Sequence, residues 1–386
     1  MADRTSVLIA GAGPAGLVLG NLLRAAGIET LILERGTREQ VQARARAGFL
    51  GANSARVLTE YGLGAGMLRD GSTHGTCAFR DEDGEFTLRY DRLGRGEQHT
   101  VYPQQRLVSD LVAEYLARGG ELRFGVTITD VDADTASVRY REDQGRTGQV
   151  DARFLAGCDG SNGVTRQAVP APARCARDHG ISWLAVLAEA PPSMPAVTYA
   201  LHERGFAGHM ARSPQVTRYY LQVPPGDEAK SWSDERIWTE LAVRMRTGEF
   251  GALRQGPVTE RRIVRLRSDV VDTLRHGRLF LVGDAASLIS PSAAKGANLA
   301  IMAAEVLAAA LVDALKRDDE RGLAAYSRTC LPRIWRAQEF SHWMIGLLHD
   351  QGGAEPFGSA LRRTRLGNLR ESRAHQDFFA ENYVGI

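Results

Sequence analysis

The sequence predicts a mixed α/β fold, α+β overall, with a Rossmann-like N-terminal domain, a mostly antiparallel β-sheet domain and a C-terminal helical region. Three patterns predict it: a buried β-α-β unit around a glycine turn, short β-rich segments in the middle of the chain, and helical periodicity beyond Gly296. A chain of 386 residues with 44% hydrophobic content is long enough for two or three packed units. We place the first domain in residues 1–174, completed by 267–298, the second in 175–288, and the helical interface region in 289–386.

The N-terminal unit is the clearest of these elements. Residues 6–10 (SVLIA) form a continuous apolar run, which is typical of a parallel strand buried on both faces. A glycine turn follows, and a helix with leucines on one side is predicted over residues 15–26, ending at Gly27. Residues 30–33 (TLIL) form the second strand, so the order is β-α-β.

The remaining elements follow from alternation, β-branched residues and proline. A helix is expected within residues 101–119, and the proline-rich residues 191–195 mark a loop. Further strands are predicted at residues 122–126, 137–140, 154–157, 183–187, 198–201, 218–223 and 279–282. Because the middle of the chain lacks helical periodicity, we expect a separate, mostly antiparallel sheet there.

Composition excludes several classes of protein. The net charge is only +2, from 48 basic and 46 acidic residues, which argues against a nucleic-acid partner. The four cysteines are scattered without metal spacing, and no secretory signal is evident, so we expect reduced thiols, no metal site and a cytoplasmic protein. The longest apolar stretch, residues 297–315, contains Asn298, Glu305 and Asp313, so we interpret it as a buried helix and expect no membrane contact.

Gly11, Gly13 and Gly16 form a G-x-G-x-x-G motif between the first strand and the first helix. Glycine permits the tight turn, the close approach of a pyrophosphate, and the packing of the helix on the sheet. Glu34 closes the second strand, where an acidic side chain binds a ribose. The motif indicates a dinucleotide site, but it does not separate FAD from NAD.

Two later segments favour FAD. Asp159 and Asp284 each follow a predicted strand directly, where a carboxylate can bind ribityl hydroxyls. Small residues then run from Pro291 to Asn298 and lead into a helix, which lets backbone N–H groups approach a flavin ring and favours negative charge there. The three segments occur in the order that a flavin domain requires.

The chain resembles the class A flavin monooxygenases, and in detail the 4-hydroxybenzoate 3-monooxygenase family, along essentially its whole length. The stretches that carry the resemblance are residues 44–50 (RARAGFL), 219–224 (YYLQVP), 232–241 (WSDERIWTEL), 276–286 (HGRLFLVGDAA), 294–300 (AKGANLA) and 381–385 (ENYVG). The resemblance implies an FAD enzyme that uses NADPH (or NADH) and O2 to hydroxylate a 4-hydroxybenzoate through a flavin C4a-hydroperoxide. The substrate would be activated as its phenolate.

The resemblance also implies roles for individual residues. The cofactor-binding set is Gly11, Gly13, Gly16, Glu34, Arg35, Arg44, Arg46, Gln104, Asp159, Arg218, Asp284, Ala297 and Asn298. Arg35, Arg38, Arg44, Arg46 and Arg267 would contact the nicotinamide coenzyme. The catalytic set is Tyr199, Tyr383, His74 and Pro291, and the substrate-binding set is Arg212, Tyr220, Tyr199, Met210 and Pro291. Arg212 would pair with the substrate carboxylate, and Tyr199, Tyr383 and His74 would relay the phenol proton to solvent. A homodimer is implied as well.

Three of the positions that depart from the family lie around the substrate ring. Met210 stands where the family has a serine that helps to bind the carboxylate, Gly208 replaces a larger apolar residue, and Phe49 a smaller one. A substituted substrate, such as 3-amino-4-hydroxybenzoate, is therefore an alternative, with hydroxylation at a different carbon. A non-catalytic FAD-binding protein is the alternative of another class. A flavin halogenase is disfavoured because none of the five tryptophans lies in a W-x-W-x-I-P signature.

Overall fold

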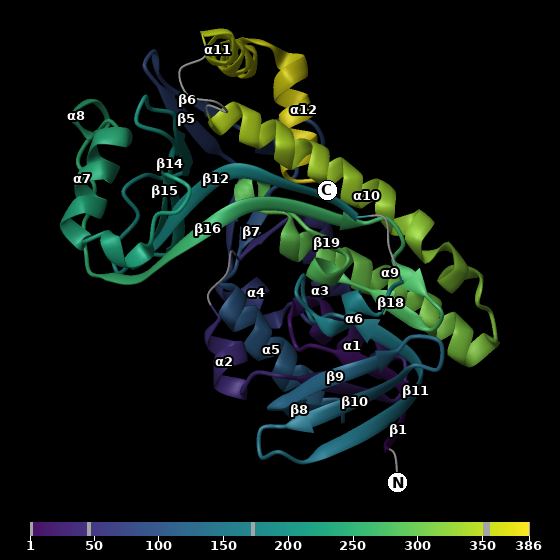
Figure 1. The fold of residues 1–386 in the computed structure, drawn as a ribbon. Coiled ribbons are helices and arrows are strands. Elements are labelled where there is room, and N and C mark those ends of the chain that lie inside the picture. Colours follow the sequence, from purple (N-terminus) through teal and green to yellow (C-terminus); the bar gives the residue numbers. More distant parts are fainter. Residues whose placement is uncertain (1–2, 45–47, 171–173, 350–355, 386) are drawn as a thin grey trace.

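The computed structural model describes residues 3–44, 48–170, 174–349 and 356–385. In these ranges the chain forms two eight-stranded sheets and one three-stranded sheet. Figure 1 shows the first sheet and its helices at the bottom of the view. Two long strands of the second sheet, β12 (Arg174–Ala188) and β16 (Val258–Val271), reach back toward the first sheet, and the helix α10 (Arg321–Leu348) runs alongside them. The mixed α/β architecture predicted from the sequence is confirmed.

The first sheet carries the predicted β-α-β unit. Its strands are β1 (Asp3–Ala10), β2 (Thr30–Glu34), β8 (Glu121–Phe124), β9 (Val126–Asp132), β10 (Ser137–Glu142), β11 (Thr147–Gly157), β17 (Arg275–His276) and β18 (Leu279–Leu281). β1 pairs in parallel with both β2 and β11, and β11 pairs in parallel with β18. Residues 7–10 are fully buried, as expected of a central parallel strand.

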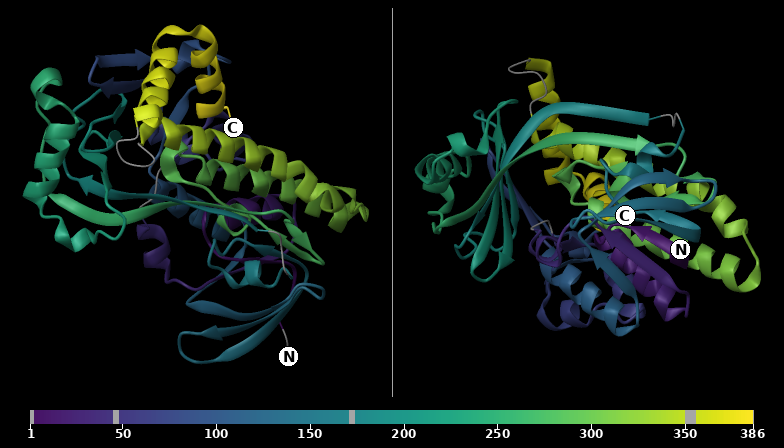
Figure 2. Two further views of the ribbon diagram at one scale, coloured as in Figure 1. Left: turned by 45° about the horizontal axis from the view of Figure 1, so that its top comes forward. Right: turned by 60° about the horizontal axis from the view of Figure 1, so that its bottom comes forward.

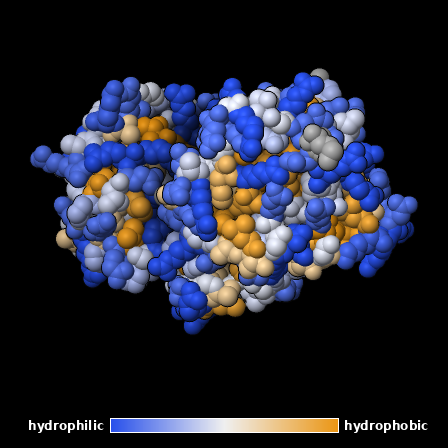
Figure 3. Space-filling model, turned by 90° about the horizontal axis from the view of Figure 1, so that it is seen from below, coloured by the Kyte–Doolittle hydropathy of each residue, from blue (hydrophilic) through white to orange (hydrophobic). Residues whose placement is uncertain are grey.

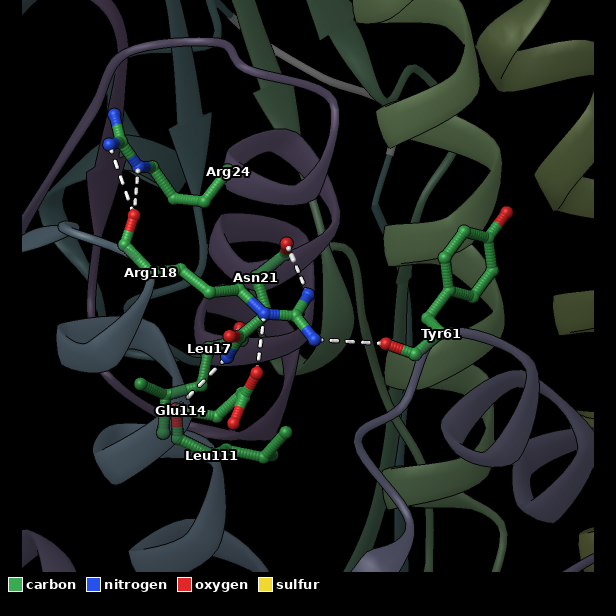
Figure 4. A network of polar contacts seen from close by, with 7 residues as sticks. All are labelled: Leu17, Asn21, Arg24, Tyr61, Leu111, Glu114 and Arg118. Carbon is green, nitrogen blue, oxygen red and sulfur yellow. Dashed lines mark hydrogen bonds and ion pairs between the residues drawn. The ribbon is translucent and has the colours of Figure 1, made fainter.

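Helix α1 (Pro14–Ala25) follows the glycine turn, with Pro14 at its first position, where a missing N–H costs nothing. It packs against α5 (Gln104–Ala117), and a polar network fixes the pair (Figure 4). The Arg118 guanidinium donates to the carbonyls of Asn21 and Tyr61 at 3.2 and 3.0 Å. The Asn21 amide donates to the Leu111 carbonyl at 3.0 Å. These bonds hold the far half of α1, so its N-terminus keeps a fixed direction.

The second sheet is mostly antiparallel, as predicted. Its order is β19-β16-β12-β15-β14-β13-β5-β6. The strands are β5 (Cys77–Asp81), β6 (Gly84–Leu88), β12 (Arg174–Ala188), β13 (Val197–Ala200), β14 (Ala207–Ser213), β15 (Val216–Val223), β16 (Val258–Val271) and β19 (Ser287–Leu288). β5 and β6 come from the segment assigned to the first domain, yet β5 pairs in parallel with β13. The two regions are therefore interleaved in the chain.

The middle region is not free of helices, which corrects the expectation from its periodicity. α7 (Asp234–Arg244) and α8 (Thr247–Phe250) lie on the outer side of the second sheet (Figure 2). The Ser233 hydroxyl caps α7 by accepting from the Arg236 N–H at 3.2 Å. Ile237, Trp238 and Leu241 pack with one face of the sheet in a separate hydrophobic cluster. The opposite face of the sheet is thus left to line the site.

The chain beyond Gly296 is helical, as predicted: α9 (Gly296–Arg317), α10 (Arg321–Leu348), α11 (Pro356–Glu371) and α12 (Arg373–Tyr383). By length and composition alone α9 could cross a membrane, with 56% of its most apolar window buried. It packs against α1, α3 (Ala52–Glu60) and α10, which agrees with the predicted buried helix. The small helices and strands are α2 (Arg38–Ala43), α4 (Ala65–Asp70), α6 (Val164–Gln167), β3 (Phe49–Leu50), β4 (Ser72–His74) and β7 (His99–Val101).

Candidate active site

A cavity of about 1290 Å³ extends from the carboxyl ends of β1, β2, β11 and β18 to the inner face of the second sheet. Figure 3 shows a recess between the smaller lobe, on the left, and the larger lobe. The volume exceeds the roughly 300–1,000 Å³ that holds one drug-sized ligand, so it suits a dinucleotide together with a small substrate. Ligands of open α/β sheets bind at this edge of the strands.

The three motif glycines have three different reasons to be glycine. Gly11 has φ +102°, and a Cβ there would lie 2.6 Å from the Cys158 carbonyl oxygen. A Cβ on Gly16 would lie 2.1 Å from the Gly11 carbonyl oxygen, so this glycine lets α1 pack closely. A Cβ on Gly13 would meet nothing within 4 Å, and Gly13 lines the cavity. The structure thus leaves open space where a pyrophosphate would approach α1.

Glu34 lies at the end of β2, buried at the edge of the cavity. Its carboxylate oxygens accept the N–H groups of Ala12 and Gly36 at 2.8 and 2.9 Å. These bonds hold the carboxylate beside the glycine turn, where it can accept further bonds from a ribose.

The two aspartates that follow strands both line the cavity. Asp159 accepts the N–H and the hydroxyl of Thr165 at 3.0 and 2.5 Å, while burial raises the pKa of its carboxyl. Asp284 follows β18, after Gly283, whose φ is +64°. Residues 288–297, which include Pro291 and Ala297, line the cavity beyond Asp284, apart from Ala293.

Other predicted cofactor residues divide into two groups. Arg35, Arg44, Gln104, Arg218 and Arg267 line the same cavity. Asn298 does not: its amide donates to the carbonyl of Phe49 and accepts the N–H of Gly51 at 3.0 and 2.8 Å. Asn298 therefore ties the start of α9 to the segment after β3. Arg46 lies outside the described residues.

The inner face of the second sheet supplies a row of cavity-lining residues. Gly208 on β14 lies directly between Tyr199 on β13 and Tyr220 on β15. Met210, two positions along β14, pairs with Arg218 on β15. Met210 is buried at the cavity wall, so an apolar thioether stands at this position.

Arg212 also lines the cavity on this face of the sheet. Its Nη1 atom is inaccessible to solvent and has no hydrogen-bond partner among the described residues. Burial is the largest cause that lowers the pKa of the guanidinium, and the neighbouring Arg218 charge acts in the same direction. A buried donor without an acceptor is costly, so the site fits an anion that would fill this place.

Tyr199 and Tyr383 are joined, as the resemblance implies. Their hydroxyls lie 2.8 Å apart, with both side chains buried. Burial is the main cause that raises the pKa of each phenol above its ordinary range. Both phenols therefore stay protonated near neutral pH. When Tyr383 donates to Tyr199, the Tyr199 hydroxyl at the cavity wall can donate its own proton to an anionic oxygen.

The imidazole beside Tyr383 is His99, a residue that the sequence did not single out. The His99 and Tyr383 rings meet edge to face, with centroids 4.9 Å apart. His74 is paired with His99 across β4 and β7, and its ring lies 6.1 Å from that of Phe49. No described hydrogen bond joins the His74 ring to Tyr383. Burial lowers the pKa of His99 well below its ordinary value, and the Lys295 charge adds to this.

Lys295 is a second residue of the site to which the sequence assigns no role. It is almost fully buried, lines the cavity, and donates from Nζ to the Tyr383 carbonyl at 2.9 Å. Burial and the Arg336 charge lower the pKa of its amine to about 7. The signal in the sequence is a single charged residue within the run of small residues from Pro291 to Asn298.

The residues present fit a flavin dinucleotide: a glycine cradle, an acidic ribose partner, a second aspartate after β18, and a small-residue loop leading into α9. The described residues contain no cluster of three metal-ligating side chains. A family model described as an FAD binding domain matches residues 4–341. The p-hydroxybenzoate hydroxylase of Acinetobacter baylyi is 37% identical over 389 residues, which cover 99% of this chain and 96% of that protein.

The chain belongs to the class A flavoprotein aromatic hydroxylases. This hydroxylase is thus a flavin monooxygenase, with FAD as cofactor and a nicotinamide coenzyme as the co-substrate typical of such enzymes. Para-nitrophenol 4-monooxygenase of Pseudomonas sp. is 26% identical, over 80% of this chain and 78% of that protein. The solved p-nitrophenol 4-monooxygenase of Pseudomonas putida has the same fold, with a TM-score of 0.82, 17% identity and 99% of both chains covered.

Proposed function

We propose that this hydroxylase acts on a para-hydroxylated benzoate. The observation that carries the proposal is Arg212, which lines the cavity and whose buried Nη1 atom has no hydrogen-bond partner in the part of the chain that the structure describes. A carboxylate enters a largely apolar pocket only when its charge is compensated, and a guanidinium can offer it two parallel donors. Tyr220 on β15 also lines the cavity and is a further partner for the acid group.

Tyr199 and Tyr383 are placed to act on the phenol group of such a substrate. Tyr199 stands at the cavity wall with its hydroxyl bonded to that of Tyr383. We propose that Tyr199 holds the substrate oxygen and that the proton leaves along the two hydroxyls. We propose that His74, which is half-buried on β4, passes it to solvent, because burial disfavours a charged ring at the neighbouring His99. Removal of this proton makes the ring electron-rich, as electrophilic hydroxylation requires.

FAD and the protein contribute different parts of the reaction. FAD, when bound, takes electrons from the nicotinamide coenzyme and activates O2, while the protein supplies position, electrostatics and exclusion of water. We propose that Gly11, Gly13, Glu34, Asp159 and Asp284 hold FAD. Arg35, Arg44 and Arg267 line the same cavity, and we propose that they receive the coenzyme phosphates, with NADPH preferred.

The ring position that is hydroxylated depends on how the substrate lies. Met210 gives the carboxylate no hydrogen bond, and Gly208 alters the wall beside Tyr199. These features favour a shifted or substituted acid, and 3-amino-4-hydroxybenzoate is the leading variant. We further propose a cytoplasmic homodimer, with the C-terminal helices as its interface.

One experiment tests the substrate class. Hydroxy- and aminobenzoates are screened for stimulated NADPH and NADH oxidation by the purified yellow protein, and each product is identified by mass spectrometry. We expect a sharp acceleration with a para-hydroxylated benzoate and a product heavier by one oxygen atom. An oxidation rate unchanged by every such acid contradicts the proposal.

A further inference from the structure

Phe206 occupies the space that a side chain at position 208 would need. A Cβ built on Gly208 would lie 2.9 Å from the Cζ atom of Phe206. Real Cβ contacts are essentially never this short. The Phe206 ring therefore lies over the Gly208 backbone, on the cavity face of the sheet between Tyr199 and Tyr220.

The ring is held by a buried aromatic group. Its centroid lies 5.1 Å from that of Trp183 and 5.2 Å from that of His349. Trp183 donates from Nε1 to Nε2 of His349 at 3.1 Å, and the other His349 nitrogen lies 2.9 Å from the Gln222 side-chain oxygen. The same oxygen accepts the Phe206 N–H at 3.1 Å. Backbone and ring of Phe206 are thus fixed by one connected network.

This position is at the phenol end of the proposed pocket. Phe206 directly precedes β14, on which Gly208, Met210 and Arg212 follow in that order, so Phe206 lies farthest along this segment from the guanidinium. Its ring is nearly parallel to that of Tyr199, at 29° and 6.3 Å between centroids. A ring whose acid group meets Arg212 and whose hydroxyl meets Tyr199 would turn the carbon beside that hydroxyl toward Phe206.

We propose that Phe206 is a specificity-determining residue: its ring, admitted by Gly208, limits the size of a substituent on the substrate carbon next to the hydroxyl. The inference rests on the proposed benzoate function. A rigid apolar wall discriminates by steric fit, and one methylene group in such a pocket typically changes the specificity ratio by about 10–200-fold.

The test compares dissociation constants of 4-hydroxybenzoate with its 3-methyl and 3-ethyl derivatives, and with the 2-methyl derivative as a positional control. The FAD-loaded wild type, Phe206→Ala and Gly208→Ala are measured by titration calorimetry. In Phe206→Ala we expect affinity for the 3-ethyl acid to rise at least tenfold relative to 4-hydroxybenzoate. In Gly208→Ala the new methyl pushes the ring into the cavity, so the relative affinity for 3-substituted acids falls at least threefold.

Phe206→Ala/Gly208→Leu supplies a further check, because the leucine fills the space that the lost ring vacates. We expect its preference for 4-hydroxybenzoate to return to within about threefold of wild type, while Leu68→Ala, on an exposed side chain of α4, changes nothing. If each single variant changes the dissociation constants of all the acids by the same factor, Phe206 does not determine specificity. Failure of the wild type to bind any of the acids instead overturns the proposed function, so the two failures are distinct.

Discussion

The hydroxyl oxygens of Tyr199 and Tyr383 lie 2.8 Å apart, although 184 positions separate the two residues in the chain. The contact forms because α12 docks beside β13 and β5. Phe379 on α12 stacks on Tyr383 and meets Phe79 on β5 edge to face. The C-terminal helix thereby completes a wall that begins on the second sheet.

Tyr199→Phe should keep substrate binding and lose about 10²–10⁴-fold in hydroxylation rate, because the first hydroxyl of the proton path is gone. Single-turnover measurement of product with bound FAD checks this. Tyr219→Phe is the matched control, since Tyr219 lies on the other face of the sheet with its hydroxyl near Ser193. Normal turnover in Tyr199→Phe would refute the proton path.

Arg212→Ala should weaken binding of 4-hydroxybenzoate more than tenfold, since a charged hydrogen bond contributes about 1.5–3 kcal/mol. The methyl ester, which lacks the charge, should bind the variant and the wild type alike. Titration of both ligands measures the difference. Arg254→Ala, on an exposed arginine, is the control. An unchanged dissociation constant for the acid would mean that its carboxylate binds elsewhere.

Met210→Ser should improve the affinity for plain 4-hydroxybenzoate about tenfold, because a hydroxyl at the cavity wall can donate to the carboxylate. Met210→Val is the control that removes bulk without adding a donor, and it should not improve the affinity. No gain in the serine variant would show that this position does not face the acid group.

Gly11 and Gly13 should respond to alanine in opposite ways. Gly11→Ala should lower the free energy of unfolding of the flavin-free protein by at least about 1–3 kcal/mol, because φ is +102° and the methyl meets the Cys158 carbonyl. Gly13→Ala should leave it within about 0.5 kcal/mol but weaken FAD binding more than tenfold, because its methyl would point into open space in the cavity. Urea unfolding and flavin fluorescence titration measure the two effects, and equal loss of stability in both variants would contradict the assignment.

His349 should make the protein sensitive to acid. Burial lowers its pKa from 6.5 to about 3, and its Nε2 must stay unprotonated to accept from Trp183. Between these two pH values the unfolded chain binds the proton and the folded chain does not. Stability is therefore full above pH 6.5 and falls as the pH drops toward 3. In His349→Gln the free energy of unfolding should decrease less between pH 6.5 and 3 than in the wild type. Urea unfolding at a series of pH values measures this, with the other histidines unchanged in both proteins. If the free energy of unfolding falls equally with pH in the wild type and the variant, His349 does not cause the acid sensitivity.

The sequence predicted best what is encoded locally. The glycine turn, the strands around it and the helices beyond Gly296 each follow from a short contiguous pattern, and all of them are present. α7 was missed although its cap Ser233 and its Ile237, Trp238 and Leu241 spacing are helical signals, because strands were expected on both sides. β14 and β16 were missed because arginines and glycines interrupt their alternation.

The parts of the site that could not be predicted depend on contacts between distant segments. His99 reaches Tyr383 only because β7 pairs with β4 while α12 packs on the same region. The Phe206 ring covers Gly208 because Trp183 and His349, from two other elements, hold it there. Arg46 remains a prediction, as do the domain boundaries and the roles assigned to individual side chains.

The pairing of β5 with β13 has a consequence for how the molecule can be divided. A fragment cut at residues 174 and 271 would keep β12 to β16 but would leave the β13 backbone without its parallel neighbour, as a bare edge open to self-association. The second sheet therefore cannot be separated from the chain as an independent domain. Heat or urea should unfold the two lobes in one cooperative step. A chimera that takes the second sheet from a relative would also need the relative's segment that corresponds to residues 77–88.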